Sequence, residues 1–236
     1  LGHGLTAKDE EELGWFGWPD GNEYLIGDIH RIREKSQFRF PGVPYYILGH
    51  SMGSFLVRQY LGVYGEGLDG AVIMGTSDLP NVLLKASQKL CLWMGKRKGW
   101  RYRSPFIDGL LIRGFEKKLG IEWLSKNDES NRRYQEDPLC GFVFTLNGYY
   151  HFFRNVCRAN ELEAAGRMPK EMPILFVSGG EDPVGFEGKG VKSVFRRYRK
   201  QGATAELKLY DGMRHVILQE LDRLQVYKDI YDWMEL

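Results

Sequence analysis

The sequence of 236 residues has few cysteines and no long apolar run, and each absence excludes a class of protein. Its three cysteines, Cys91, Cys140 and Cys157, are odd in number and scattered, with no CxxC pair and no Cys/His spacing typical of a metal site. We therefore expect reduced thiols in a reducing, cytoplasmic compartment, and neither a metal nor another cofactor. No stretch reaches the roughly 18 apolar residues that predict a membrane span, and none has the pattern of a signal peptide.

Internal repeats, low-complexity segments and signs of disorder are also missing. Hydrophobic residues make up 43% of the chain and aromatic residues 14%, which is enough to fill the core of one sizeable domain with an insertion. A net charge of +2 gives no reason to expect nucleic-acid binding, so any basic function must be local. The oligomeric state is not indicated by any pattern.

The most informative stretch is a short apolar run, Tyr45–Leu48, that leads into Gly49-His50-Ser51-Met52-Gly53 and then into a helical pattern that continues to about Tyr64. Strand, sharp turn and helix form the context in which G-x-S-x-G predicts a nucleophile elbow, with Ser51 in a strained backbone conformation. We expect glycine at positions 49 and 53 because a Cβ at either would collide with the neighbouring strand or helix. Composition alone would produce this pattern in about one such chain in seven, so the prediction depends on its context.

In the flanking sequence, predicted strands alternate with predicted helices. The run Asp69–Thr76 is too apolar to alternate, which favours a parallel sheet covered on both faces. In the first predicted helix Leu25, Ile29 and Ile32 fall at helical spacing. The other predicted elements are a loop over 1–19, helices over 22–36, 191–201 and 217–234, and strands over 172–178 and 205–210.

Residues from about 78 to 168 contain no convincing buried strand and indicate several helices rich in aromatic side chains. Between Leu79 and Lys118 there are ten Lys or Arg residues against Asp108 and Glu116. Two interpretations stay open. The charges can form a solvated helix face, or they can belong to a lid that lies near anionic lipid headgroups.

Three residues in the chain order Ser, acid, His carry the catalytic hypothesis. Ser51 closes one predicted strand, Asp182 follows a later one, and His215 follows the last. In open α/β sheets active sites lie at these carboxyl ends of strands. A serine nucleophile needs a general base, and the base needs a carboxylate to fix its tautomer.

Other residues compete for these roles. Glu181 adjoins Asp182, but Asp182-Pro183 opens a loop and is the better position for the acid; Asp211 is expected to make a turn bond. None of the other histidines follows the last strand; they are His3, His30, His50 and His151. For the oxyanion hole, the backbone N–H of Met52 at the helix N-terminus is expected to supply one donor. The second donor normally comes from a loop after an earlier strand.

With these residues placed, the chain resembles the α/β-hydrolase superfamily, and within it the serine aminopeptidase S33-type branch that includes monoacylglycerol lipases and bacterial lysophospholipases. The motifs that carry the resemblance are Gly2-His3-Gly4, Gly49–Gly53, Asp69-Gly70 with Gly75-Thr76, Asp137-Pro138-Leu139-Cys140, Gly179–Pro183 and Gly212–His215.

The resemblance implies an α/β-hydrolase core, 1–77 and 169–236, under a helical cap, 78–168. It also implies hydrolysis of carboxylic esters with a single lipophilic acyl chain, and a basic cap that makes a peripheral membrane contact. Two alternatives remain: acyl transfer or aminopeptidase chemistry at the same triad, and a non-catalytic hydrolase used for binding.

The chain departs from the family pattern at its beginning. It starts with Leu1 directly before Gly2-His3-Gly4, whereas the family carries roughly four more strands ahead of this loop, including a His-Gly segment that donates the second oxyanion N–H. We expect a fragment of a longer protein that lacks N-terminal strands. Its elbow strand would expose a hydrophobic sheet edge, and the fragment by itself would be inactive or poorly stable.

Overall fold

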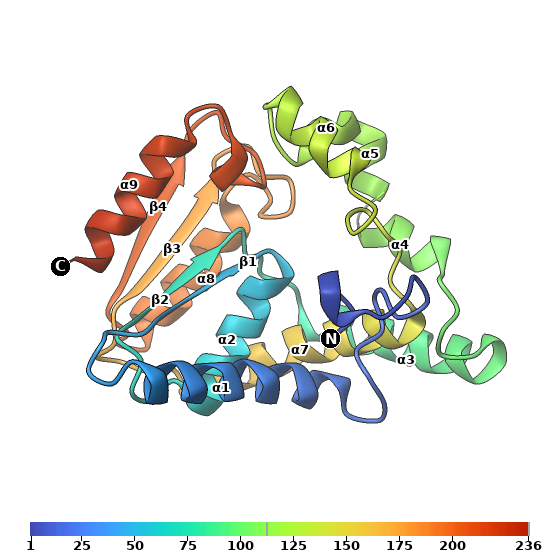
Figure 1. Cartoon of the computed structure of the whole chain (residues 1–236), viewed down its shortest axis with the longest axis horizontal. Coiled ribbons are helices and arrows are strands. Elements are labelled where there is room, and N and C mark those ends of the chain that lie inside the picture. Colours follow the sequence, from blue (N-terminus) through green and yellow to red (C-terminus); the bar gives the residue numbers. More distant parts are fainter. Residues whose placement is uncertain (112, 236) are drawn as a thin grey trace.

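One parallel β-sheet flanked by helices forms the centre of the molecule (Figure 1). The computed structural model describes residues 1–111 and 113–235. Within them the strands follow the order β1-β2-β3-β4 and all pairings are parallel. The strands are Tyr46–His50 (β1), Gly70–Met74 (β2), Ile174–Gly179 (β3) and Ala205–Tyr210 (β4). Because parallel strands end at the same edge, the residues that follow them converge there.

The middle of the sheet is covered on both faces, as the sequence predicts. Along β2, Ala71 and Ile73 join one hydrophobic cluster, while Val72 and Met74 join the other. The first cluster includes side chains from helices α1 (Gly21–Arg39), α2 (Met52–Tyr64) and α8 (Lys189–Lys200). The second includes side chains from α9 (Arg223–Met234).

Strand β1 is an edge of this sheet. It pairs with β2, from Tyr46 opposite Gly70 to His50 opposite Met74, and with no other described strand. Its side chains are less buried than those of β2 and β3, and Leu48 keeps 45% of its surface exposed. An apolar edge strand of this kind is a site where other chains can pair.

Two helices differ from the prediction. In α1 the predicted residues Leu25 and Ile29 pack against the core beside Ile26, which is 3% exposed, whereas Ile32 is 61% exposed. The predicted apolar stripe was wrong at Ile32 because Arg33 takes the buried position, where its guanidinium bonds the carbonyls of Tyr64 and Glu66 at 2.7 Å each. The last predicted helix is interrupted: a short 3₁₀ turn, η3 (Ile217–Gln219), precedes α9.

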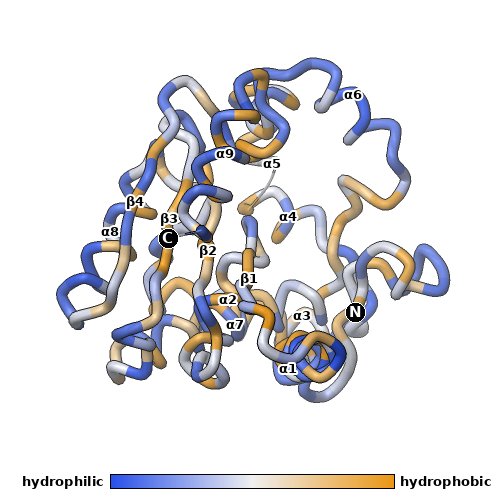
Figure 2. Tube along the Cα trace, turned by 60° about the vertical axis from the view of Figure 1, so that its left-hand side comes forward, coloured by the Kyte–Doolittle hydropathy of each residue, from blue (hydrophilic) through white to orange (hydrophobic). Residues whose placement is uncertain are grey.

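Between β2 and β3 the described chain is helical and has its own apolar cluster, which includes Leu84, Cys91, Ile107 and Leu146. Helix α7 packs against both α3 and α2, so it lies between this segment and the sheet layer. Figure 2 shows α6 as hydrophilic along its length, at the outer end of the segment. The elements are α3 (Asn81–Lys98), α4 (Pro105–Leu111), α5 (Arg113–Leu119), η2 (Gly120–Trp123), α6 (Asp128–Glu136) and α7 (Leu146–Ala164). A short 3₁₀ turn, η1 (Gly4–Thr6), lies in the N-terminal loop.

Candidate active site

Ser51 occupies the sharp turn between β1 and α2. Its φ of 54° and ψ of −119° are unusual for a residue with a side chain. Such a conformation costs on the order of 1–3 kcal/mol and is found mainly at functional sites. The Ser51 amide donates to the carbonyl of Met74 at 3.0 Å, which joins the turn to the end of β2. This is the backbone geometry of a nucleophile elbow.

The two glycines of the motif, Gly49 and Gly53, differ in whether a side chain would fit at their position. A Cβ on Gly49 would lie 2.2 Å from the carbonyl oxygen of Gly53 and 2.6 Å from Val57 Cγ2, so only glycine fits there. At Gly53 a Cβ would meet nothing within 4 Å. The expected collision at Gly53 was therefore wrong, because this position in the first turn of α2 faces open space.

His215 and Asp182 form a buried pair of titratable groups at this end of the sheet. His215 Nδ1 lies 3.0 Å from each carboxylate oxygen of Asp182, and both side chains are buried. A carboxylate in this position fixes the imidazole with its proton on Nδ1, which leaves Nε2 free to accept another. The sequence-predicted acid and base are thus in contact.

The surroundings of Asp182 favour its charged form. Burial acts to raise its pKa, but the attraction and hydrogen bond of His215, with further bonds from the loop backbone, hold the pKa below its ordinary value. The Val184 amide donates to Oδ1 at 2.9 Å, and the Ser178 hydroxyl to Oδ2 at 3.3 Å. The competing carboxylate, Glu181, instead pairs with Lys126 at 2.8 Å.

His50 has a contact that the sequence did not indicate. Its Nε2 lies 3.0 Å from the backbone carbonyl of His215, and the two rings are 4.7 Å apart. Burial and the neighbouring His215 lower the pKa of His50 to about 4, so at neutral pH its ring is uncharged and Nε2–H donates this bond. Gly75, with φ of 60°, leaves room for the pair, since a Cβ there would lie 3.2 Å from each ring.

Ser51 and His215 are connected indirectly, through His50. Ser51 directly follows His50, whose ring contacts the His215 loop. Within the described residues no hydrogen bond links the Ser51 hydroxyl to His215. Met52 begins α2, where the first amides of a helix have no intrahelical partner. The Ser51–His215 contact and the role of the Met52 N–H therefore stay predictions.

Sequence reasoning missed a buried ion pair behind the elbow. Arg58 and Glu163 are both fully buried and meet at 2.7 Å. Arg58 also donates to Thr76 Oγ1 at 3.1 Å and to the carbonyl of Ser77 at 2.9 Å, which fixes the loop after β2. Arg197 of α8 reaches the same carboxylate at 2.9 Å. The available signal was an arginine among the apolar residues of α2.

Two other histidines lie in packed surroundings. The ring of His3 contacts Phe16, Phe142 and Phe144 at centroid distances of 5.3 to 5.6 Å. His151 is buried, and its Nδ1 accepts a bond from the Asn22 amide at 3.2 Å.

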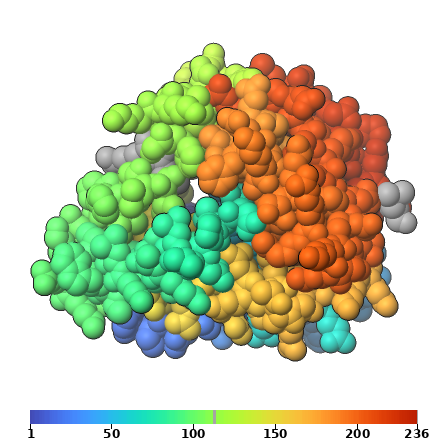
Figure 3. All heavy atoms as spheres, turned by 180° about the vertical axis from the view of Figure 1, so that it is seen from behind, coloured from blue at the N-terminus to red at the C-terminus, as the bar shows by residue number. Residues whose placement is uncertain are grey.

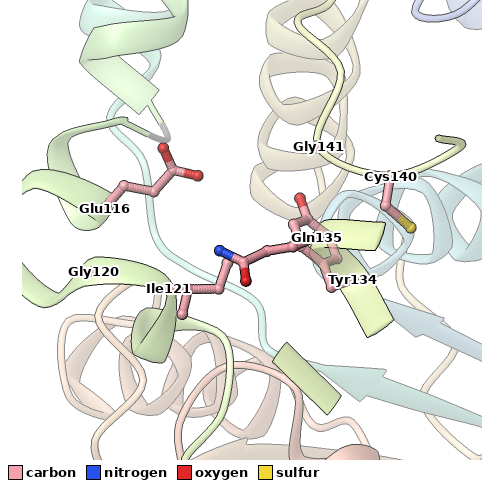
Figure 4. A pocket seen from close by; sticks show the side chains of 7 residues that line it. All are labelled: Glu116, Gly120, Ile121, Tyr134, Gln135, Cys140 and Gly141. Atoms are coloured by element: carbon pink, nitrogen blue, oxygen red, sulfur yellow. The ribbon is translucent and has the colours of Figure 1, made fainter. Parts of the chain in front are cut away.

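Two open pockets lie in or beside the segment between β2 and β3. One, of about 410 Å³, is lined by Glu116 and Gln135 on opposing helices and by Cys140 on the loop that follows α6 (Figure 4). The other, of about 480 Å³, lies against Arg103 and Phe142. Neither lining includes Ser51, Asp182 or His215. Among the described residues no group of three or more His, Cys, Asp or Glu could hold a metal ion.

The parallel sheet, the strained serine turn and the buried Asp–His pair at the strand ends define the α/β-hydrolase class. Residues 1–222 match the family described as "Serine aminopeptidase, S33", and the chain belongs to this family. The predicted α/β-hydrolase fold and the monoacylglycerol-lipase-like branch are confirmed, and the chain is placed among the ester hydrolases.

Curated relatives align along almost the whole chain. It is 25% identical over 238 residues to a "Monoglyceride lipase homolog" of Monkeypox virus, with 99% of this chain and 76% of the relative covered. It is 24% identical over 254 residues to the "Monoglyceride lipase" of Mus musculus, with 99% and 70% covered.

One solved structure has a higher sequence identity to this chain than these two relatives. A thermostable carboxyl esterase from Bacillus coagulans, determined in complex with glycerol, is 29% identical with a TM-score of 0.87, over 99% of this chain and 77% of that one. In the described part of the chain, no helix is long and apolar enough to cross a membrane.

Proposed function

We propose that this protein is a serine hydrolase that cleaves the carboxylic ester bond of lipophilic monoacyl substrates, monoacylglycerols or lysophospholipids, through an acyl-enzyme. The observation that carries the proposal is the buried His215–Asp182 pair, with both oxygens 3.0 Å from Nδ1, at the end of the sheet where Ser51 holds a positive φ. Together these features support a triad.

In the proposed mechanism the Ser51 hydroxyl attacks the ester carbonyl carbon while His215 Nε2 takes its proton. Asp182 stabilises the resulting imidazolium. The carbonyl oxygen gains the negative charge, and the Met52 N–H at the start of α2 donates to it. When the intermediate collapses, His215 returns the proton to the leaving alcohol. The same histidine then activates a water that hydrolyses the acyl-enzyme.

The substrate class is supported by the names of two relatives, one called a monoglyceride lipase and the other a monoglyceride lipase homolog. Tyr149, Phe152 and Phe153 in the segment between β2 and β3 pack into an apolar cluster, and we propose that this segment also supplies the apolar surface for a single acyl chain.

We further propose that the basic cap contacts a membrane surface through α3. Val82 is 83% exposed and Trp93 is 52% exposed, and both lie on one face with Lys89 and Lys96. Apolar and aromatic side chains among lysines are typical of helices that lie at a lipid interface. The rival interpretation is a solvated helix face with no lipid contact.

Other chemistries at the same triad are acyl transfer and peptide-bond hydrolysis, and a binding role without catalysis is a further alternative. Rates on monoacylglycerol, lysophospholipid and aminoacyl-anilide substrates separate the enzymatic alternatives. A preference for the anilide would favour the aminopeptidase, and no turnover of any substrate would favour the binding role.

Ser51→Ala tests the proposal on the full-length protein. We expect loss of ester hydrolysis by a factor on the order of 10⁴ or more and loss of labelling by a fluorophosphonate probe, which reacts with activated serines. Ser36→Ala is the matched control, since Ser36 lies on α1, outside the site, and its hydroxyl bonds the Ile32 carbonyl one turn back at 2.9 Å. Retained labelling of Ser51→Ala would contradict the assignment.

A further inference from the structure

Trp123 covers the candidate catalytic histidine. It is the last residue of η2, and its indole lies on the imidazole of His215 with ring centroids 5.5 Å apart and planes inclined by 27°. Figure 3 shows the wider contact from behind, where light green atoms of this segment touch orange and red atoms of the loops after β3 and β4. A residue from the segment between β2 and β3 therefore forms part of the site.

Backbone contacts on both sides fix this stacking. The Arg214 guanidinium donates to the carbonyl of Glu122 at 2.7 Å, and the Val216 amide donates to the carbonyl of Leu124 at 2.8 Å. The neighbours of Trp123 are thus paired with the neighbours of His215. These two contacts hold the indole of Trp123 in place against the imidazole of His215.

A buried carboxylate strengthens the same contact. Glu220 accepts bonds from the Ser125 hydroxyl at 2.8 Å and from the Lys126 amide at 2.9 Å. Its other oxygen accepts the Arg214 amide at 2.8 Å. The polar groups of these flanking contacts are therefore well satisfied.

The indole N–H of Trp123 is the exception. The side chain is 4% exposed, and Nε1 has no hydrogen-bond partner in the part of the chain that the structure describes. An indole nitrogen only donates, and a buried donor without an acceptor costs about 1–3 kcal/mol. Each such group needs an explanation, and here it lies beside the residue that must hand a proton to the leaving alcohol.

We propose that Trp123 is a specificity-determining residue whose indole N–H donates a hydrogen bond to a hydroxyl oxygen in the alcohol portion of the ester. This inference rests on the proposed function. His215 must reach the leaving oxygen, so the alcohol portion adjoins the imidazole and the ring stacked on it. A fatty acyl chain carries no acceptor beyond its carbonyl. A polyol such as glycerol carries hydroxyl oxygens next to the ester bond, and a simple alkyl alcohol does not.

The test compares two esters of one fatty acid, the glyceryl ester and the ethyl ester. Trp123→Phe keeps an aromatic ring over His215 and removes the N–H. We expect kcat/KM to fall by about 10-fold to 100-fold on the glyceryl ester and by less than about threefold on the ethyl ester. Trp18→Phe, a half-exposed tryptophan of the N-terminal loop, is the matched control and should change neither. Equal losses on both esters would show a structural role and overturn the proposal, as would no loss on the glyceryl ester.

A binding experiment separates this inference from the proposed hydrolysis. Calorimetric titration of Ser51→Ala with a 1-O-alkylglycerol ether and with the matching alkyl ethyl ether needs no turnover. We expect tighter binding of the alkylglycerol, and loss of that advantage in Ser51→Ala/Trp123→Phe. Equal affinities of Ser51→Ala for the two ethers would overturn the proposal even if the protein hydrolyses esters.

The tryptophan indole N–H resonances give a readout without substituting Trp123, in case Trp123→Phe fails to fold. The resonance of Trp123 should shift on addition of the alkylglycerol and not of the alkyl ethyl ether. An unchanged resonance at saturating alkylglycerol would overturn the proposal.

Discussion

At the scale of single residues, the adjacent carboxylates Glu181 and Asp182 lie in different surroundings. Asp182 is buried against His215 and bonded by the loop backbone, whereas Glu181 points outward to Lys126. The chain order predicted this choice from a local feature, the Asp182-Pro183 loop that follows a buried strand. Its physical basis is that only one of two consecutive side chains can face the imidazole.

Asp182→Asn and Glu181→Gln test this choice. Asp182→Asn should lower kcat by a factor on the order of 10⁴ because an amide stabilises neither the tautomer nor the imidazolium. Glu181→Gln should retain activity within about threefold, since it loses only a partly exposed ion pair. Steady-state rates on one soluble ester suffice, and the reverse ranking would assign the acid to Glu181.

The predicted catalytic residues Ser51, Asp182 and His215 each have a local signal, a strand end followed by a turn, and the structure brings Asp182 and His215 into contact. Sequence reasoning missed Trp123 and its unpaired N–H because nothing near residue 123 indicates a contact with residue 215. It also predicted a steric requirement for glycine at position 53, which the structure does not show because the space beside Gly53 is open.

At the scale of elements, α3 carries two different faces. Leu84 and Cys91 are buried in the apolar cluster, while Val82 and Trp93 face outward. The Arg97 guanidinium lies 4.5 Å from the centre of the Trp93 ring, so the aromatic side chain and the positive charge occupy the same patch.

Val82→Ser/Trp93→Ser should weaken binding to phosphatidylserine-containing vesicles, because it removes the apolar side chains that would enter the lipid interface. Sedimentation with the vesicles at low and physiological salt measures this, and the remaining charge-dependent binding should fall as salt rises. Tyr231→Ser, which removes an exposed aromatic side chain from α9, is the control. Vesicle binding that is absent in the unaltered protein, or equal in all variants, would favour the solvated face.

At the scale of the whole molecule, the Arg58–Glu163 pair joins parts that lie far apart in the chain. The two residues are 105 positions apart, on α2 and α7, and Tyr198 of α8 adds a bond to Glu163 at 3.1 Å. Through Thr76 the network also holds the loop after β2. The elbow helix, the sheet and the helical segment therefore depend on one buried charge cluster.

Arg58→Met should lower the free energy of unfolding by about 3–5 kcal/mol, because it leaves the Glu163 carboxylate buried with less compensation. Arg58→Met/Glu163→Gln should recover part of this loss, since the uncompensated charge is gone. Urea unfolding followed by circular dichroism gives both values. A single variant as stable as the unaltered protein would show that the network contributes little.

The sequence was sufficient for the parallel sheet and for the four strands found among the described residues, because short apolar runs bounded by turns carry their signal locally. It failed at Ile32, where a buried arginine replaced an apolar stripe, and at the interrupted last helix. It also missed the Arg58–Glu163 pairing. In these cases the deciding contacts join distant segments, so no window of sequence contains them.

At the strained turn of Ser51, the residue that best suits the backbone conformation differs from the residue that the proposed reaction needs. Glycine adopts a positive φ far more readily than serine, so selection for a well-folded protein alone would favour replacing this residue. In the proposed mechanism, the nucleophilic hydroxyl of Ser51 is what offsets this cost to the fold. If the Ser51 hydroxyl is the nucleophile, replacing Ser51 by glycine would remove the backbone strain and the reaction together.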